Sequence, residues 1–157
     1  MGENAERVQT YLSERLSESV PEADWETEYR VGSTPVDVAG KTEDELALVE
    51  LEWRRADPAD NAAKLFRHAS SESDDVGDVR VFQVFTRYYE LSDGGVSSKR
   101  KNAEFVGATA AESLDGFEYA ALTLDFVPPK RGGGIPEGWR DEVEAVVEKI
   151  DTRVRRG

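Results

Sequence analysis

The stretch PVDVAGKTEDELALVELEW, residues 35–53, predicts two β-strands joined by an acidic turn. The first strand, residues 35–40, begins at a proline and stops at a glycine. The second strand, residues 46–53, has Val49, Leu51 and Trp53 on one face and carboxylates at positions 50 and 52. Because the side-chain period of a strand is two, Glu50 and Glu52 point to the same face. We therefore expect the two glutamates to lie side by side on one face of this strand.

The flanking sequence extends this hairpin into an α/β pattern. Residues 79–89 are apolar on both faces and predict a buried central strand. In the helix that follows, we expect Phe105, Val106 and Thr109 to face inward. Three successive strands followed by alternating helices and strands imply one domain, residues 1–157, whose mixed sheet carries helices on both faces. The predicted order α-β-β-β-α-β-α-β-α comprises helix 3–18, strands 25–31, 35–40 and 46–53, helix 59–71, strand 79–89, helix 98–113, strand 117–127 and helix 136–155.

Composition bounds the chemistry and the setting. The 157 residues include 33 acidic and 20 basic ones, for a net charge of −13, with no cysteine and one histidine. Disulfides, thiolate metal sites and multi-histidine centres are therefore excluded. The acids are dispersed and arginine outnumbers lysine, which favours the cytoplasm of a halophilic organism, where salt screens self-repulsion. In such a protein the overall charge does not exclude nucleic acid as a partner. No apolar run is long enough to cross a membrane, and no secretory signal is present.

Three carboxylates form the candidate catalytic centre. Asp37 lies in the middle of the first strand, and it shares a face with Glu50 and Glu52 if the two strands pair as a hairpin. Carboxylates that gather on a partly buried sheet repel one another and need a compensating charge. Mg²⁺ is the natural candidate, because it takes carboxylates and waters as ligands. Such an ion can hold a water nucleophile and stabilise charge on a phosphoryl oxygen.

The helix predicted after this hairpin contributes polar and cationic side chains. Asn61, Lys64 and His68 lie at positions i, i+3 and i+7, on one helix face, and Arg67 borders that face. Lys64 can thus lie over the carboxylates, where it would orient a water or offset charge in the transition state. Arg54 continues the acidic face of the second strand and is a candidate for phosphate contact.

PVDVAG and VELEWRRADPADNAAKLFRH, with twelve residues between Asp37 and Glu50, resemble the active-site region of the PD-(D/E)XK restriction-endonuclease-like superfamily. The stretches VFTRYY and KRKNAEFVG also resemble such domains, and the similarity extends over residues 3–127. It implies an α-β-β-β-α-β core in which Asp37 and Glu50 occupy the motif's carboxylate positions. Glu52 stands where the motif has lysine, and Lys64 matches the displaced position that some families of the group use.

The resemblance implies a nuclease. On it, the function is metal-dependent hydrolysis of phosphodiester bonds in nucleic acid, DNA being favoured, with Asp37, Glu50 and Glu52 binding Mg²⁺ or Mn²⁺. Nucleases of this type that cut both strands often pair, so a homodimer or a partner subunit is also expected. One polar residue and eight basic residues are expected to contact the nucleic-acid backbone. They are Asn61, and Arg54, Arg67, His68, Lys99, Arg100, Lys101, Lys130 and Arg131.

Two alternatives follow from the same residues. The first is a catalytically inactive module on the same fold that binds nucleic acid or a protein partner, which suits the missing lysine of the motif. The second is an α/β domain unrelated to nucleases, whose acids serve only solvation; it predicts that Asp37 and Glu50 face away from each other. For Lys64 the alternative to a catalytic role is an ion pair with Asp60, four residues earlier.

Overall fold

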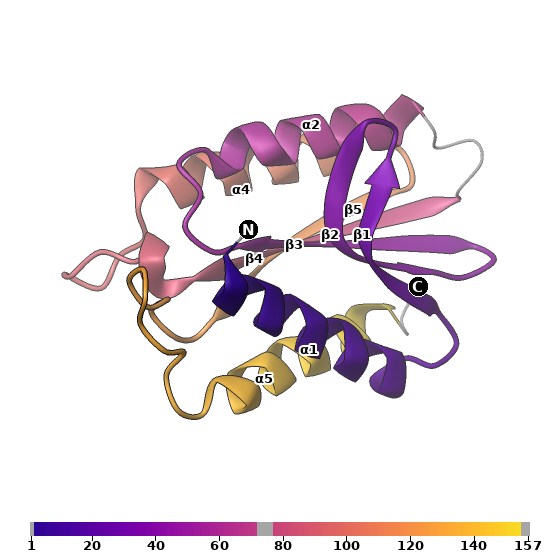
Figure 1. The fold of residues 1–157 in the computed structure, drawn as a ribbon. Coiled ribbons are helices and arrows are strands. Elements are labelled where there is room, and N and C mark those ends of the chain that lie inside the picture. Colours follow the sequence, from indigo (N-terminus) through magenta and orange to yellow (C-terminus); the bar gives the residue numbers. More distant parts are fainter. Residues whose placement is uncertain (1, 72–76, 155–157) are drawn as a thin grey trace.

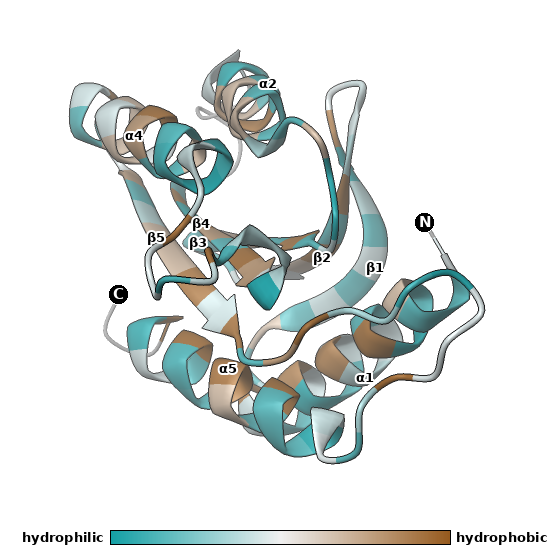
Figure 2. Ribbon diagram, turned by 90° about the vertical axis from the view of Figure 1, so that its left-hand side faces the viewer, coloured by the Kyte–Doolittle hydropathy of each residue, from teal (hydrophilic) through white to brown (hydrophobic). Residues whose placement is uncertain are grey.

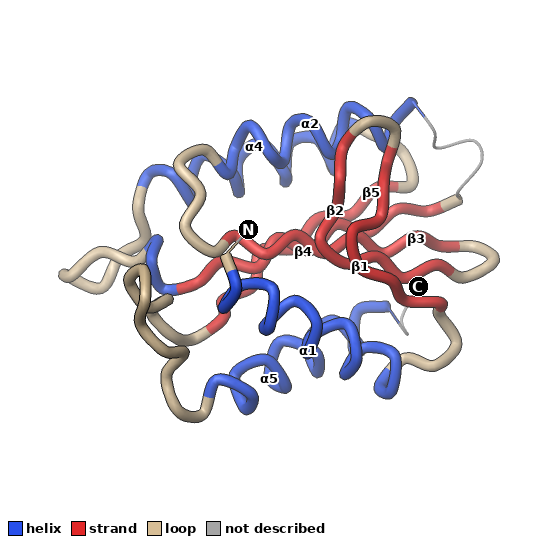
Figure 3. The backbone as a smooth tube through the Cα atoms, viewed as in Figure 1, coloured by secondary structure: helices blue, strands red, loops and turns tan. Residues whose placement is uncertain are grey.

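A five-stranded mixed sheet in the order β1-β2-β3-β4-β5 forms the centre of the computed structural model, which describes residues 2–71 and 77–154 (Figure 3). The first three strands pair antiparallel, and the last three pair parallel. Parallel neighbours need a crossover, and a helix supplies it in each case. The strands are β1 (Asp24–Val31), β2 (Thr34–Lys41), β3 (Glu45–Glu52), β4 (Asp78–Thr86) and β5 (Phe117–Leu124).

Helices cover both faces of the sheet, as predicted (Figure 1). One face carries α1 and α5, and the other carries α2 and α4. The first six elements follow the α-β-β-β-α-β order that the resemblance implies, so the predicted fold class is confirmed. No helix within the described residues is long and apolar enough to cross a membrane. The helices are α1 (Glu3–Ser19), α2 (Pro58–Ser71), α4 (Ser98–Ser113) and α5 (Trp139–Val154).

The larger core lies between the sheet and the pair α1 and α5, whose apolar sides face it (Figure 2). On α5 the buried stripe includes Val143, Val147 and Ile150, at the three- and four-residue spacing that one helix face requires. These side chains join the cluster that holds Val49 and Leu51 of β3. Burying each such side chain contributes about 1.5–3 kcal/mol. The opposite side of β3 carries Leu46 and Leu48, which join a second core, followed by Glu50 and Glu52, which share a face as predicted.

Strand β2 continues through Gly40, which the sequence predicted as its end. Gly40 pairs with Trp25 of β1, and a Cβ atom there would lie 2.6 Å from the Trp25 ring. The indole covers the glycine and donates to the Val20 carbonyl at 3.0 Å. The glycine is therefore explained by close packing rather than by strand termination.

Three predicted boundaries were wrong at their ends. The strand predicted over residues 79–89 stops at Thr86, and Arg87–Tyr89 form the 3₁₀ helix η1. The Thr86 hydroxyl donates to the Trp53 carbonyl at 2.7 Å and accepts from the amide of Tyr88, which turns the chain out of the sheet. β5 ends at Leu124, before residue 127, and α5 begins at Trp139 rather than at residue 136. The predicted helix end at residue 155 lies outside the described residues.

Helix α4 faces the sheet with a different stripe from the one predicted. Phe105 is 71% exposed, whereas Arg100, Ala103 and Gly107 are buried. A Cβ on Gly107 would lie 2.3 Å from the Tyr119 ring, so the glycine lets this ring lie against the helix. Phe105 lies two residues from Ala103, about 200° around the helix, and therefore points to solvent.

Candidate active site

Asp37 and Glu50 meet where the pairing of β2 and β3 ends. The pairing reaches Val38 and Val49 and does not continue to the next position, which is Asp37 opposite Glu50. There the Asp37 Oδ2 atom accepts a hydrogen bond from the Leu51 amide at 2.7 Å, so a side chain replaces the backbone acceptor. Both carboxyl groups lie within 4.0 Å of the same Arg55 guanidinium, so Glu50 faces Asp37. A purely solvating role for the acids predicts that Asp37 and Glu50 face away from each other, and the structure contradicts that prediction.

Burial dominates the electrostatics of these carboxyl groups. Glu50 exposes 2% of its surface and Glu52 exposes none. Burial raises the pKa of Glu50 well above its usual value, and the charge of Asp37 raises it further. Burial also raises the pKa of Asp37, against the hydrogen bonds from Glu50 and the backbone. The site therefore holds its protons tightly when no cation compensates its charge.

Arg55 is the cation beside this pair. Its guanidinium nitrogens lie 3.7 Å from Asp37 Oδ1 and 4.0 Å from Glu50 Oε2. Strand alternation, if it continued, would place Arg54 on this face instead. Strand β3 ends at Glu52, so the alternation stops before the two arginines. Arg54 donates to the Pro128 carbonyl at 3.2 Å and lies away from the carboxylates.

Glu52 is held by amide donors from two elements. Asn61 of α2 donates to its Oε1 atom at 2.7 Å, and Gln83 of β4 donates to the same atom at 3.0 Å. Gln83 also donates to the Pro58 carbonyl and accepts from the Tyr119 hydroxyl at 2.6 Å. Burial raises the pKa of Tyr119, which keeps its hydroxyl protonated as a donor. Gln83 and Tyr119 were missed in the sequence, although a glutamine inside an apolar strand is a signal that it needs buried partners.

The donor set fits a hard divalent cation. The Glu50 Oε1 and Glu52 Oε2 atoms are buried acceptors without a hydrogen-bond partner. Within the described ranges, no three carboxylate or histidine side chains are arranged as a metal-ligand set. Asp37 and Glu50 instead offer a pair, and Mg²⁺ is usually bound by one or two carboxylates, with waters and substrate phosphates as the other ligands.

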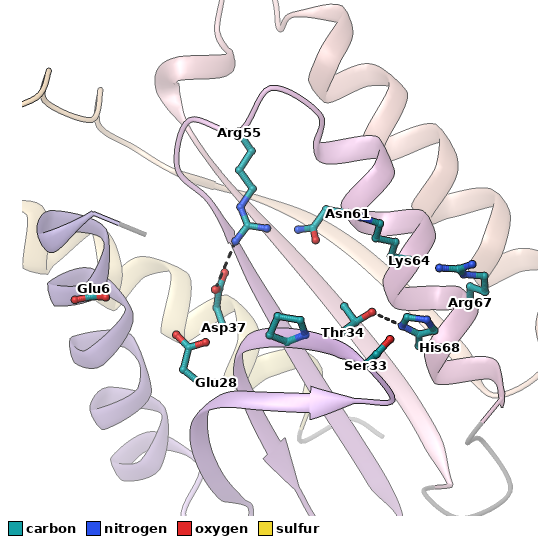
Figure 4. Close-up of a pocket in the computed structure, with 11 residues that line it drawn as sticks. Glu6, Glu28, Ser33, Thr34, Asp37, Arg55, Asn61, Lys64, Arg67 and His68 are labelled. Carbon is teal, nitrogen blue, oxygen red and sulfur yellow. Dashed lines mark hydrogen bonds and ion pairs between the residues drawn. The ribbon is translucent and has the colours of Figure 1, made fainter.

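A cleft of about 570 Å³ opens over Asp37 (Figure 4). One wall comes from α1, β1 and β2 and carries Glu6, Glu28 and Asp37. The facing wall comes from the loop after β3 and from α2, and it is polar and cationic. The predicted helix face is confirmed, because Asn61, Lys64, Arg67 and His68 all line this cleft. The lining residues are Glu6, Glu28, Ser33, Thr34, Pro35, Asp37, Arg55, Asn61, Lys64, Arg67 and His68.

The cationic wall is partly engaged within the protein. The Lys64 ammonium lies 3.0 Å from the Asp60 carboxylate, on the exposed side of α2. His68 Nδ1 is hydrogen-bonded to the Thr34 hydroxyl across the cleft. Arg67 is exposed at the cleft and makes no ion pair with any described carboxylate.

Glu28, which the sequence analysis did not single out, has a strained backbone on the acidic wall. Its φ of 55° lies in the left-handed region, which costs a non-glycine residue about 1–3 kcal/mol. The β1–β2 pairing is interrupted there, opposite Asp37. Gln9 of α1 donates to the Glu28 carboxylate at 3.1 Å and fixes its direction. Nothing in the sequence marks this position, because the strain arises from tertiary packing.

The remaining predicted nucleic-acid contacts lie outside this cleft. Arg100 is buried, donates to Thr123 at 2.9 Å and lies over the Phe85 ring. Lys99 and Lys101 are the exposed cations beside it. A separate cavity of about 510 Å³ gathers Arg54, Lys130 and Arg131 near the start of α1.

The Glu50→Gln substitution is expected to stabilise the protein in the absence of divalent metal, increasingly as the pH rises. The folded-state pKa of Glu50 lies above its ordinary 4.5, so the folded state loses stability as the pH rises from that value through the folded pKa. A glutamine carries no charge at any pH. At pH 8 we therefore expect the variant to unfold at a higher temperature than the wild type, with the difference shrinking toward pH 4.

Thermal unfolding in EDTA between pH 4 and pH 8 measures this difference. Glu26→Gln is the matched control, because Glu26 is an exposed carboxylate of β1 outside the cleft. A Glu50→Gln effect that does not change with pH would contradict the assigned burial cost.

Solved structures of known proteins align with the chain, among them these three. The EndoMS–dsDNA2 complex aligns with a TM-score of 0.44 and 23% identity, over 81% of this chain and 45% of that chain. A repair endonuclease from Pyrococcus abyssi aligns with a TM-score of 0.43 and 22% identity, over 82% and 49%. Pyrococcus furiosus SfsA in complex with Ca²⁺ aligns with a TM-score of 0.40 and 15% identity, over 77% and 58%. The chain thus spans about half the length of these proteins. No protein-family model and no curated protein matches its sequence.

Proposed function

We propose that this protein hydrolyses phosphodiester bonds of nucleic acid, DNA being favoured, with Mg²⁺ or Mn²⁺ as cofactor. The observation that carries the proposal is the buried pair of Asp37 and Glu50 beside Arg55, with Asp37 lining a cleft whose other wall is cationic. A buried carboxylate pair is costly unless a cation compensates it. The preference for DNA rests on the resemblance of the Asp37–Glu50 region to the restriction-endonuclease-like superfamily.

The side chains at this site have different roles in the proposed reaction. Asp37 and Glu50 would hold the metal, which supplies an activated water and stabilises charge on a phosphoryl oxygen. Asn61 and Gln83 fix the direction of Glu52 behind this pair. Arg55 lies beside both carboxylates of this pair, and its guanidinium can turn to a phosphate oxygen when substrate enters.

Lys64 is proposed to position the attacking water or to offset charge on the phosphate. It lines the cleft on the same helix face as Asn61 and lies three residues further along α2. We expect Lys64→Ala to lower the cleavage rate about 10–100-fold, as for other groups that support a metal site. Lys149→Ala is the control, because Lys149 is an exposed lysine of α5 on the other face of the sheet. Equal rates for the two variants would contradict the assignment.

The test of the function is a cleavage assay on plasmid, linear duplex, single-stranded DNA and RNA. It compares Mg²⁺, Mn²⁺ and EDTA, at low salt and at the high KCl concentration that the acidic composition favours. The proposal predicts cleavage that requires the metal. No cleavage of any substrate by the folded wild-type protein would contradict it.

The second candidate is an inactive module that binds nucleic acid or a protein partner. Two contacts favour it: Arg55 already compensates the carboxylate pair, and Lys64 pairs with Asp60. This candidate predicts that no divalent metal binds in the micromolar range, which a calorimetric titration measures directly.

A further inference from the structure

The cleft ends at a bridge between the β1–β2 hairpin and α2. Thr34, just after the hairpin turn, is buried and its hydroxyl is hydrogen-bonded to His68 Nδ1 in the last turn of α2. Figure 1 shows the hairpin curling from the sheet toward this helix. In Figure 4, Ser33 and Thr34 lie beside His68, at the end of the cleft away from Arg55. A continuous strand would have to cross this bridge to leave the cleft on that side.

Polar and basic side chains of α2 line the cleft from the carboxylates to the end where the bridge lies. Asn61 donates to Glu50 and Glu52, and Lys64, Arg67 and His68 follow along α2. The rise of an α-helix places residue 68 about 10 Å beyond residue 61. This length suits a short stretch of strand, and the cleft volume of 570 Å³ lies in the range of roughly 300–1,000 Å³ that small ligands occupy.

Arg67 is an exposed guanidinium at the end of the cleft where the bridge lies. The chain has 33 acidic residues against 20 basic ones, yet Arg67 makes no ion pair with a carboxylate in the part of the chain that the structure describes. The Ser33 hydroxyl is exposed on the same cleft, opposite α2. The guanidinium of Arg67, the imidazole of His68 and the hydroxyl of Ser33 at this end of the cleft are groups that suit a negatively charged phosphate.

We propose that the cleft takes the end of a single nucleic-acid strand, with the terminal phosphate between Arg67, His68 and Ser33. This inference rests on the proposed function, and it adds that the substrate is a strand with a free end. The bond that is cut then lies at Asp37 and Glu50, a short distance inside that end. A covalently closed strand cannot reach the carboxylates in this way.

Fluorescence anisotropy in EDTA tests the inference without hydrolysis. The probes are an internally labelled single-stranded oligonucleotide with a 5′-phosphate, a 3′-phosphate or two hydroxyl ends, and the same sequence closed into a circle. We expect the strand with either the 5′-phosphate or the 3′-phosphate to bind with a dissociation constant at least about tenfold lower than that of the circle. Arg67→Glu should remove this difference, and inorganic phosphate should compete with the strand and not with the circle. Arg153→Glu on α5 makes the same charge change on the other face of the sheet and should have no effect.

Equal binding of circle and strand, an unaffected Arg67→Glu variant, or no binding by the folded wild-type protein would overturn the inference. Its failure is distinct from that of the proposed function. Metal-dependent cleavage of the circle as fast as of the strand would leave the nuclease in place and remove the end preference. End-specific binding without cleavage of any substrate would do the reverse.

Discussion

The Asp37→Asn variant is expected to lose metal-dependent cleavage by more than about 100-fold, since even groups behind a metal ligand contribute 10–100-fold. Asp37 lines the cleft directly, and it shares the neighbouring Arg55 guanidinium with Glu50. An asparagine keeps the shape and loses the charge that would hold a divalent cation. The loss should therefore appear in the rate of cleavage, whichever nucleic acid proves to be the substrate.

This variant should remain folded. Asparagine keeps a side-chain oxygen that accepts from the Leu51 amide, as the Asp37 Oδ2 atom does. The substitution also removes a carboxyl whose burial raises its pKa, so the cost of burying a charge disappears. Circular dichroism checks the fold, and Glu26→Gln serves as the exposed control on β1. Unchanged cleavage by a folded Asp37→Asn protein would contradict the assignment of the site.

Gln83→Leu is expected to destabilise the protein by about 3–5 kcal/mol, because each buried polar group left unpaired costs about 1–3 kcal/mol and Glu52 loses one of its two amide donors. Gln83 is 1% exposed and donates to Glu52 and to the Pro58 carbonyl. It also accepts from the Tyr119 hydroxyl, which would lose its acceptor. The leucine fills the volume and satisfies none of these three groups.

Urea unfolding measures this loss, and a Glu52→Gln background isolates its cause. With the charge of Glu52 removed, Gln83→Leu should cost only about 1–3 kcal/mol, the penalty for unpaired neutral groups. The same loss in both backgrounds would show that Gln83 acts through packing alone. It would then not be a support of the Glu52 carboxylate.

The sequence predicted the hairpin and its faces because β3 has a clear two-residue period. Val49 and Leu51 are in the core between the sheet and α1 and α5, and Glu50 and Glu52 are on the other face. The helix spacing likewise predicted that the polar residues of α2 would share one cleft. These features follow from local periodicity, which the chain carries at every position.

Features that depend on tertiary contact were not predictable in the same way. Arg55 reaches the carboxylates because β3 ends at Glu52, a boundary that no pattern in the sequence marks. Phe105 was expected inside because it is large and apolar, but the sheet faces the small residues of α4. The strained backbone of Glu28 depends on its neighbours across the sheet and on α1.

The most direct test of the central claim is a titration of the protein with Mn²⁺, in which electron paramagnetic resonance measures the free ion. The buried pair of Asp37 and Glu50 predicts binding by the wild type in the micromolar range. Asp37→Asn should lose this binding, and Glu26→Gln should keep it. Folded wild-type protein that binds no Mn²⁺ in this range, or an Asp37→Asn variant that binds it equally, would contradict the assignment of these carboxylates to a metal site.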